Sequence, residues 1–327
     1  MNGRPADHVV IVRRSTEHDV PAMVALACRT LGWDDDDATR AHFVWKHFEN
    51  PFGRSDLWVA DVDGAIVGLR SFLRWELVGG DGTVWRAART VDTGTDAAYR
   101  RTGIFTRLTH AGLDRLRADG VDLVFNTPNA QSLAANLTLG WDVVGRLPTV
   151  VRPAGPRGLL ALARARTPAD RGALPCPVGA PAVEVLADAS YAAALLGRAG
   201  PPTGLTTRRS AEYLAWRYGH AALHHRVLGG PDATAVFQVR RRGRATEAVV
   251  ADVFAAPDAR RAVTRVLGAV LRETGADYLL ALAPGRRPRR FLPLWRSGPV
   301  LTTRSVGAPA PTTRSAWALT MGDIAGL

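Results

Sequence analysis

The residues best suited to chemistry lie in one short segment, Tyr99-Arg100-Arg101-Thr102-Gly103. Its two arginines supply positive charge, and Gly103 lets a ligand approach the backbone closely. A strand pattern precedes the segment and a helix pattern follows it, so backbone N–H groups and the positive end of a helix dipole converge on the loop. This loop indicates a phosphate site, to which the Thr106 hydroxyl can also donate. The alternative is an ordinary strand-to-helix turn that carries surface arginines.

Other kinds of site are excluded by their missing motifs. No Gly-Lys-Ser/Thr follows the loop, and the Gly-x-Gly-x-x-Gly pattern of dinucleotide-binding folds is absent. The only cysteines are Cys28 and Cys176, so there is neither a disulfide framework nor a Cys-x-x-Cys spacing, and we expect no metal. No apolar run approaches the ~18 residues that a membrane span needs. We therefore expect a protein of the reducing cytoplasm with no membrane partner.

The charge balance has two interpretations. The 327 residues include 42 Lys+Arg and 30 Asp+Glu, which gives a net charge of +12. This excess indicates either an anionic partner or the arginine bias of a GC-rich genome. We interpret the basic run Arg286-Arg287-Pro288-Arg289-Arg290 as a solvated surface, with an anionic substrate group or a nucleic acid as the alternative. Because no nucleic-acid-binding motif accompanies it, we do not expect a nucleic-acid partner.

The elements in front of the loop are predicted from hydrophobic periodicity. We expect a strand at 9–12, a helix from Pro21, and a second helix at 38–48 whose apolar side contains Phe43, Val44 and Phe48. The acidic run at 34–37 serves mainly to cap the second helix. The Asp63-Gly64 pair supplies the positive φ values of a tight hairpin turn and predicts an antiparallel meander.

The loop itself belongs to a strand, helix, strand unit. A strand at 84–95 leads into the loop, and a helix at 104–117 has its apolar residues on one side. Gly120 ends this helix before a strand at 121–125. The expected fold class is therefore α/β with a mixed, mostly antiparallel sheet flanked by helices.

The pattern of the first half returns after a segment rich in proline and glycine at 148–182. The matches keep their order while their separation shrinks, which predicts a tandem repeat whose second copy has lost loop residues. The matched pairs are Trp45-Lys46 with Trp216-Arg217, Ala65-Ile66-Val67 with Ala235-Val236-Phe237, Val91-Asp92 with Ala251-Asp252, and Gly120-Val121-Asp122 with Gly275-Ala276-Asp277.

Residues 8–150 resemble the acyl-CoA-binding core of the GNAT superfamily of N-acetyltransferases. Arg100 and Gly103 match the signature Arg/Gln-x-x-Gly-x-Gly/Ala, whereas Phe105 replaces its final small residue. Asn126-Thr127-Pro128-Asn129 and Leu139-Gly140-Trp141 follow where that family has equivalent motifs. The sequence is similar to a bacterial subgroup with a second, degenerate GNAT-like half, as is the closing segment from Trp317 to Asp323. The resemblance implies an acyl-CoA-binding domain at 1–150, a connector at 151–185 and a degenerate GNAT-like domain at 186–327.

The resemblance also implies a cofactor, acetyl-CoA or another acyl-CoA, and the residues that bind it. The bulky Phe105 either points into the core or narrows the cofactor groove. Backbone groups of Thr93, Gly94 and Thr95 are expected to pair with the pantetheine arm, and the pyrophosphate is held by Arg100, Arg101, Thr102, Gly103, Ile104, Phe105 and Thr106. Asn129 and Ser132 are expected near the thiol end or the arm of the cofactor.

Acyl transfer to an amine needs a group that binds the amine or accepts its proton. Asp92 is our main catalytic candidate, as base or amine-binding group, and Asn126 is a second. The alternative for Asp92 is a strand-end carboxylate paired with an arginine such as Arg89. Glu76 and His47 are weaker candidates. His47 has no visible partner, and a lone histidine beside Trp45 is more often a packing residue.

One position departs from the family pattern in a way that affects the chemistry. Many members protonate the departing thiolate with a tyrosine five residues before the aromatic residue of the Leu-Gly-aromatic motif, but here that position is Asn136. An amide cannot act as an acid toward a thiolate. Either the thiolate leaves without help, or the acid comes from elsewhere, or the protein does not catalyse acetyl transfer.

The function that we expect is an N-acyltransferase that moves an acyl group from acyl-CoA to a primary amine of a small molecule or peptide. We expect direct attack by the amine, because Cys28 and Cys176 lie outside the expected cleft. In the second half Val263 stands where the first has Gly103, so this copy is expected to hold no cofactor and to wall the acceptor cleft. The chain is expected to be a monomeric pseudo-dimer or a homodimer. The alternatives are a transferase that uses aminoacyl-tRNA, which suits the +12 charge, and an acyl-CoA-binding module without catalysis, which suits Asn136.

Overall fold

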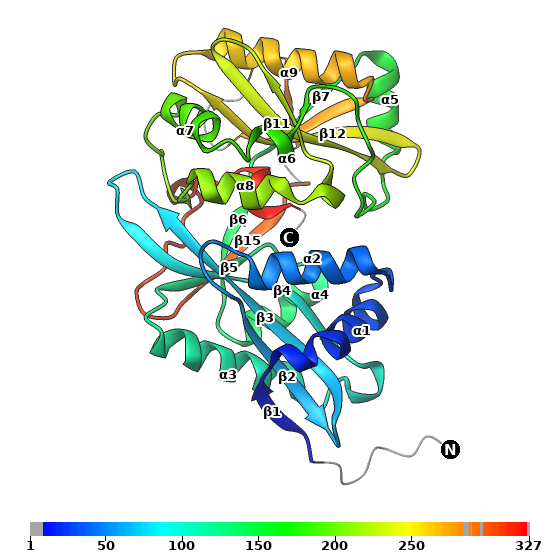
Figure 1. Cartoon of the computed structure of the whole chain (residues 1–327), viewed down its shortest axis with the longest axis vertical. Helices are drawn as coiled ribbons and strands as arrows, with labels where there is room; N and C mark the ends of the chain where they lie inside the picture. The colour runs from blue at the N-terminus through cyan, green and yellow to red at the C-terminus, as the bar shows by residue number, and fades with distance from the viewer. Residues whose placement is uncertain (1–8, 284–287, 289, 295–296, 326–327) are drawn as a thin grey trace. The chain divides into compact units, whose positions relative to one another are not determined.

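The computed structural model describes residues 9–283, 288, 290–294 and 297–325. They form two compact units (Figure 1), each with its own sheet region. Unit 1 runs to Glu76 and includes Trp85–Val143 and Thr302–Pro311. Unit 2 contains Leu77–Val84, Val144–Leu301 and the residues from Thr312 onward. Two sheet regions in one chain are consistent with the predicted tandem arrangement.

The first sheet is mostly antiparallel, with the strand order β1-β2-β3-β4-β5-β15-β6. Strands β3, β4, β6 and β15 each have residues in both units. The elements are β1 (Ile11–Arg14), η1 (Glu17–Asp19), α1 (Val20–Leu31), α2 (Asp37–Phe48), β2 (Asp56–Val62), β3 (Ala65–Val78), β4 (Val84–Thr95), η2 (Ala97–Tyr99), α3 (Ile104–Ala118), β5 (Leu123–Asn126), α4 (Ala130–Thr138), β6 (Asp142–Arg146) and β15 (Val300–Ser305).

Helices cover both faces of the first sheet (Figure 1). Neighbouring residues of a strand point to opposite faces, and Val59 packs with α1 and α2 while Ala60 packs with α3. Met23 and Phe43 anchor α1 and α2, and Ile104 and Leu108 anchor α3 in its own cluster. The predicted apolar side of α2 is partly wrong, because Val44 is 37% exposed while Phe43 is fully buried.

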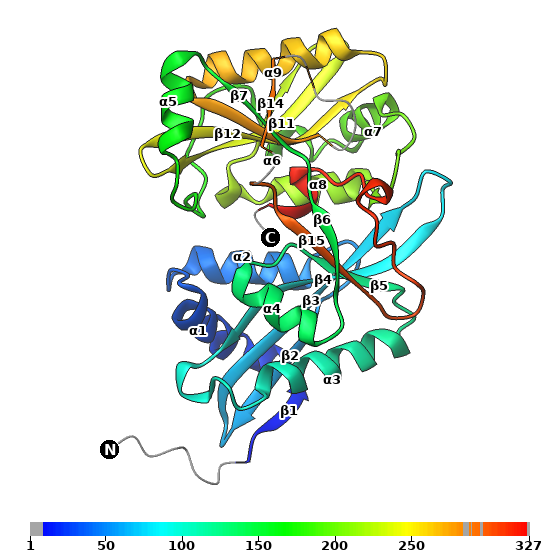
Figure 2. The same cartoon turned by 180° about the vertical axis from the view of Figure 1, so that it is seen from behind.

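The parallel pair β4–β5 is short, and this matters for the site. Its register joins Ala87–Arg89 to Leu123–Phe125, after which β4 continues to Thr95 while β5 ends at Asn126. On its other edge β5 pairs with β15, a strand from far along the chain, and the two lie side by side in the view from behind (Figure 2). In the described part of the chain, Thr93–Thr95 therefore have no registered partner on the β5 side.

The second sheet has the strand order β14-β7-β13-β12-β11-β10-β8. One of its faces packs against α9, whose Val266, Leu267 and Val270 enter the core with Phe237. β9 (Thr206–Thr207) pairs with β3 of the first sheet. The other elements of the chain are β7 (Thr149–Pro153), α5 (Pro156–Arg164), β8 (Ala180–Pro181), α6 (Ala182–Val185), α7 (Ala189–Arg198), α8 (Ala211–Gly219), η3 (Ala221–Leu223), β10 (Arg226–Gly229), β11 (Ala233–Arg242), β12 (Ala245–Ala255), α9 (Arg260–Thr274), β13 (Tyr278–Leu282), β14 (Leu292–Pro293), η4 (Arg314–Ala316) and α10 (Met321–Ile324).

The element order supports the comparison of the two halves. The series α2-β2-β3-β4-α3-β5 has the counterpart α8-β10-β11-β12-α9-β13, and the four sequence matches fall in or beside corresponding elements. The segment predicted as a connector at 151–185 contains most of β7, which pairs with β13, and also α5, β8 and α6. The repeat and its domain boundaries stay predictions. Within the described residues no helix has the length and apolar character to cross a membrane.

Candidate functional site

The loop before α3 has the geometry of an anion site. Gly103 precedes the helix with φ 82° and Arg101 has φ 65°, so the chain turns sharply through left-handed conformations before α3 begins. The first N–H groups of a helix have no acceptor within the helix. Here they face a loop in which Arg100, Arg101, Thr102 and Gly103 are all exposed. Backbone N–H donors, two arginine side chains and the positive end of the α3 dipole therefore all lie at this exposed loop.

The end of β4 supplies the neighbouring backbone. Gly94 packs so closely against α1 that a Cβ atom there would lie 2.3 Å from the Thr30 hydroxyl oxygen, so a larger residue would displace one or the other. The Thr93 hydroxyl accepts a hydrogen bond of 3.0 Å from Arg70. The Thr95 carbonyl accepts one of 3.4 Å from Arg100. These contacts tie the strand end to the loop.

Phe105, the departure from the family signature, packs on a buried cation. Its half-buried ring lies 4.7 Å from the guanidinium carbon of Arg70, and the rings of Phe72 and Trp141 lie at 5.4 and 5.9 Å. Arg70 is 2% exposed, and within the described residues its Nε and Nη2 atoms have no hydrogen-bond partner. Burial lowers the pKa of Arg70 to about 9. Cation–π contacts with three rings offset part of the cost of burying this charge.

Asp92 lies at the centre of a buried polar cluster formed by α2 and β4. Its Oδ2 atom is 2.5 Å from Lys46 Nζ and 2.9 Å from His47 Nε2, and His47 Nδ1 is 2.9 Å from Ser55 Oγ. The Lys46 ammonium also lies 4.9 Å from the centre of the Trp33 ring. Asp92 itself has φ 40°, a conformation that costs energy for this residue, so these contacts hold it in place. The partner of Asp92 is Lys46, not the arginine that the alternative interpretation named.

The charges of this cluster follow from its contacts. Burial by itself raises the pKa of Asp92, but the Lys46 ammonium and the His47 hydrogen bond outweigh it and hold that pKa well below its usual range. Burial lowers the pKa of His47 against the opposing effect of Asp92, so the imidazole is neutral at pH 7. Since ionised Asp92 only accepts, His47 Nε2 carries the proton and the Ser55 hydroxyl donates to Nδ1. The result is a directed chain from Ser55 through His47 to Asp92.

The remaining predicted residues divide between exposed and structural positions. Asn129 caps α4, where its side chain accepts from the Ser132 N–H at 2.8 Å. The Asn126 side chain is buried and accepts from the Thr302 hydroxyl of β15. Asn136 is fully buried, and neither amide atom has a partner within the described residues. The arginines at 286, 287 and 289 of the predicted basic run lie outside the described residues.

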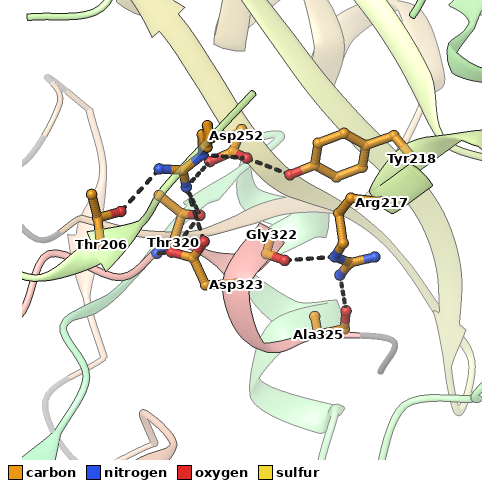
Figure 3. A network of polar contacts seen from close by, with 9 residues as sticks. Thr206, Arg217, Tyr218, Asp252, Thr320, Gly322, Asp323 and Ala325 are labelled. Carbon is orange, nitrogen blue, oxygen red and sulfur yellow. Dashed lines mark hydrogen bonds and ion pairs between the residues drawn. The ribbon is translucent and has the colours of Figure 1, made fainter. Parts of the chain in front are cut away.

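The equivalent carboxylate of unit 2, Asp252, sits in a different network (Figure 3). Its Oδ1 atom accepts from Arg209 at 2.9 Å, and its Oδ2 atom accepts from Arg209 at 3.3 Å and from the Tyr218 hydroxyl. Burial and the Asp252 charge raise the pKa of Tyr218, which therefore stays a donor. Arg209 also pairs with Asp323 at 3.0 Å beside Thr320, so this cluster fixes the segment around α10.

Three members of the unit 1 site were missed from the sequence. Lys46 was noted only as part of a repeat match, and Ser55 and Arg70 carry no local signal of function. His47 was a weaker candidate with no visible partner in the sequence, and the structure shows that it contacts both Ser55 and Asp92. A lysine and a histidine next to each other, matched by Arg217 and Tyr218 in the second half, were the signal that could have identified the cluster.

Comparisons with known proteins agree with this geometry. A family model described as an acetyltransferase (GNAT) domain matches residues 11–144. A GCN5-related N-acetyltransferase from Kribbella flavida is similar in structure, with a TM-score of 0.62 and 15% identity over 92% of this chain and 72% of that chain. Another from Anabaena variabilis gives a TM-score of 0.61 and 12% identity over 91% and 73% of the two chains. No curated protein matches the sequence.

A third solved structure extends the likeness to a different genus. Eis1 from Mycobacterium abscessus has a TM-score of 0.56 and 17% identity, over 91% of this chain and 74% of that chain. At such identities the structural likeness shows the fold, which these chains share over most of their length. The family itself comes from the match over 11–144, whose members transfer acyl groups from acyl-CoA. Residues 11–144 are therefore a GNAT acetyltransferase domain.

Proposed function

We propose that unit 1 transfers an acyl group from an acyl-CoA to a primary amine of a small molecule or peptide, by direct attack of the amine. The observation that carries this proposal is the exposed loop from Arg100 to Gly103 at the start of α3, next to the free edge of β4. Acyl-CoA, when bound, supplies the reactive thioester. Its pyrophosphate suits the loop, and its amide-rich arm suits the β5 side of Thr93–Thr95, which has no registered strand partner in the described residues.

The proposed step forms a C–N bond and breaks a C–S bond. The bound ammonium group first gives up one proton to water, the neutral nitrogen then attacks the thioester carbonyl carbon, the CoA thiolate departs, and the nitrogen loses a second proton to a base or to water. Asp92 is a poor base, because its pKa is held low by Lys46 and His47. In the described part of the chain its contacts with Lys46 and His47 both go to Oδ2. We therefore assign to Asp92 the amine-binding role, in which Oδ1 holds the acceptor's ammonium group.

Two further observations support direct attack and an unassisted leaving group. Burial raises the pKa of the Cys28 thiol, which disfavours the thiolate that a covalent acyl-enzyme would need, and Cys176 belongs to unit 2. The fully buried amide of Asn136 cannot protonate a thiolate. The CoA thiolate is therefore proposed to leave without an acid from this position.

We also propose that unit 2 is a degenerate copy that binds no acyl-CoA. Its helix α9 begins at Arg260 after Ala259, which takes the place that Gly103 has before α3, whereas Val263, the residue matched from the sequence, lies inside α9. A cytoplasmic location, the domain boundaries at 150 and 186, and a monomeric or homodimeric state remain predictions.

Calorimetry with acetyl-CoA tests the proposal. Wild type is expected to bind with a dissociation constant in the micromolar range, and Gly103→Glu is expected to abolish binding because its carboxylate enters the phosphate site. The matched control is Gly82→Glu, since Gly82 has the same φ of 82° and equally open surroundings but lies in the turn between β3 and β4. The second measurement is thiol release with a panel of amines, where wild type is expected to turn over.

Each contrary result has its own meaning. Equal binding by wild type and Gly103→Glu would overturn the assignment of the loop. If wild type does not bind acetyl-CoA at all, the cofactor is wrong and the aminoacyl-tRNA alternative gains weight. Tight binding without thiol release on any amine would overturn the transfer and leave an acyl-CoA-binding module.

A further inference from the structure

Unit 2 contains a pocket that the proposed transfer does not use. It has a volume of about 530 Å³ and lies along α9, next to the loop that joins β10 to β11. Pockets of 300–1,000 Å³ are the usual size for small-molecule ligands. Its lining combines a mainly apolar wall with four arginines, namely Arg152, Arg265, Arg272 and Arg290.

One end of the pocket lies where the edge strand of unit 2 is shorter than that of unit 1. In unit 1, β1 pairs with β2 from Ile11 to Arg14, and the Arg107 side chain of α3 donates to the Val10 carbonyl, so chain covers this side of α3. In unit 2, β8 has only Ala180 and Pro181, which pair with Val227 and Arg226. Among the described residues no edge strand pairs with the rest of β10, whose Leu228 and Gly229 line one end of the pocket.

The charges in the pocket do not balance. Arg265 pairs with Asp232 and Arg272 with Glu273, each at 3.6 Å between exposed side chains, and such pairs are weak. Arg152 has no acidic partner in the part of the chain that the structure describes. Its Nη1 atom is buried without a hydrogen-bond partner there. Burial and the nearby charges of Arg290 and Arg272 lower the pKa of Arg152, so three cations gather without enough anions.

A glycine in α9 leaves room for the Arg152 guanidinium. Gly268 of α9 faces it, and a Cβ atom at this position would lie 3.0 Å from Arg152 Nη1. Apolar side chains of Leu228, Ala233, Val266 and Ala269 line the pocket beside it. A guanidinium favours carboxylate and phosphate oxygens, which it can bind with two parallel hydrogen bonds.

From this placement we infer that the α9 pocket of unit 2 binds a small amphipathic anion, with its carboxylate or phosphate on Arg152 and its apolar body against α9. The ligand is not a second acyl-CoA, because α9 lacks the glycine loop that precedes α3. This inference does not depend on the proposed transfer in unit 1.

Calorimetry on the full chain tests the inference with four probes of equal chain length: octanoate, octyl phosphate, octanol and octylamine. Octanoate or octyl phosphate is expected to bind, and whichever binds more tightly identifies the preferred head group. Octanol and octylamine are expected to bind at least tenfold more weakly. Equal binding of octylamine would overturn the inference.

Variants test separately the positive charge of Arg152 and the open volume of the pocket. Arg152→Gln is expected to weaken binding of the anion by about tenfold or more, the loss that follows from one charge-assisted hydrogen-bonded pair. Ala269→Phe keeps every charge but fills the pocket, and it too is expected to weaken binding. The control Arg244→Gln removes an exposed arginine from the turn between β11 and β12 and should change nothing. Equal losses in Arg244→Gln and Arg152→Gln would mean non-specific attraction to a basic protein and would overturn the site.

One further experiment tests whether the α9 pocket is independent of the proposed acyl-CoA site. Gly103→Glu is expected to bind the octyl anion as wild type does, and acetyl-CoA is expected not to displace it. Displacement by acetyl-CoA in Gly103→Glu would make the pocket a CoA site and overturn the inference. Failure of acetyl-CoA to bind anywhere would overturn the proposed transfer but not this pocket.

Discussion

Two aspartates that match between the halves do the same work in both units. Asp122 stands at the start of β5, where its side chain accepts from the Arg86 N–H at 2.8 Å and its own N–H donates to the Arg86 carbonyl at 2.7 Å. Asp277 makes the same pair of contacts with Thr246, at 2.8 and 2.9 Å. These contacts join the strand after the helix to its parallel neighbour. Where a residue serves the fold, both units keep it.

The other matched pair, Asp92 and Asp252, shows the opposite behaviour. In each unit the aspartate contacts a residue from the matched helix, His47 in one and Tyr218 in the other. However, Asp252 uses both carboxylate oxygens on Arg209 and Tyr218, whereas Asp92 uses only Oδ2 within the described residues. The same position therefore has both carboxylate oxygens bonded in unit 2 but only one in unit 1, beside the loop that we propose as a phosphate site.

The largest expected effect is on stability and comes from removing Asp252, whose two carboxylate oxygens both accept hydrogen bonds. Asp252→Ala leaves Arg209 with Asp323 as its one carboxylate partner in the described residues and removes the acceptor of Tyr218, so the free energy of unfolding should fall by about 3–5 kcal/mol. Urea denaturation followed by circular dichroism measures it. The control Asp258→Ala changes an exposed carboxylate next to α9 and should stay within about 0.5 kcal/mol of wild type. A loss below about 1 kcal/mol in Asp252→Ala would mean that the network contributes little.

The next prediction tests whether Asp92 binds the acceptor amine or has only a structural role. Asp92→Asn keeps the shape but removes the charge that holds an ammonium group, a loss of about 2 kcal/mol, or roughly 30-fold in kcat/KM for the amine. The change should appear mainly in KM, and the pH profile of kcat should keep its shape. Asp252→Asn, measured per folded molecule, should leave both constants unchanged. A fall confined to kcat together with loss of the low-pH limb of the profile would make Asp92 the base instead.

The parts of the fold that sequence predicted are those with local signals. The Asp63-Gly64 hairpin, the apolar side of α3 and the glycine before it depend on residues close together in the chain, and the structure contains each as predicted. Even the acidic run acts as expected, since Asp36 caps α2 by accepting from Thr39 at 2.7 Å. The first strand was displaced by two residues, and β1 is Ile11–Arg14.

Contacts between distant segments were not predictable in this way. The pairing of β15 with β5 joins Thr302 to Asn126, and no periodicity in either segment specifies its partner. The same holds for the Lys46, His47 and Asp92 cluster, because α2 and β4 meet only after the sheet has formed. Arg70 was missed since its sequence context is an ordinary strand, and only the structure reveals that three aromatic rings surround it.

The two buried histidines predict a pH dependence that differs between the units. Burial lowers the pKa of His47 and, together with Arg217, lowers that of His225 further. The unfolded chain takes up a proton below about pH 6.5 that the folded chain resists, so the free energy of unfolding falls as the pH drops, by up to about 1.4 kcal/mol per pH unit for each histidine. Above that pH both contributions are fully present.

Urea denaturation between pH 7.5 and 5 measures this dependence. His47→Gln and His225→Gln should each show a shallower fall than wild type, and the effect of His225→Gln should extend to lower pH. His110→Gln, an exposed position on α3, is the control and should keep the wild-type slope. Identical slopes in all four proteins would mean that neither histidine is held neutral by burial.

The smallest expected effect contrasts two buried arginines. Arg217 is held by backbone carbonyls, since its Nε donates to Gly322 at 2.8 Å and its Nη2 to Ala325, whereas Arg70 donates only to Thr93 in the described structure. Arg217→Met should therefore destabilise the protein, because it leaves those carbonyls without a donor. Arg70→Met should raise the free energy of unfolding by about 1 kcal/mol, because relief from burying a poorly paired charge exceeds the lost cation–π contacts.

The same substitution, Arg70→Met, should weaken acetyl-CoA binding a few-fold by calorimetry, since it removes a positive charge from beneath Phe105. A stability loss in Arg70→Met with unchanged acetyl-CoA binding would make Arg70 a structural residue like Arg217 and remove this difference between the units.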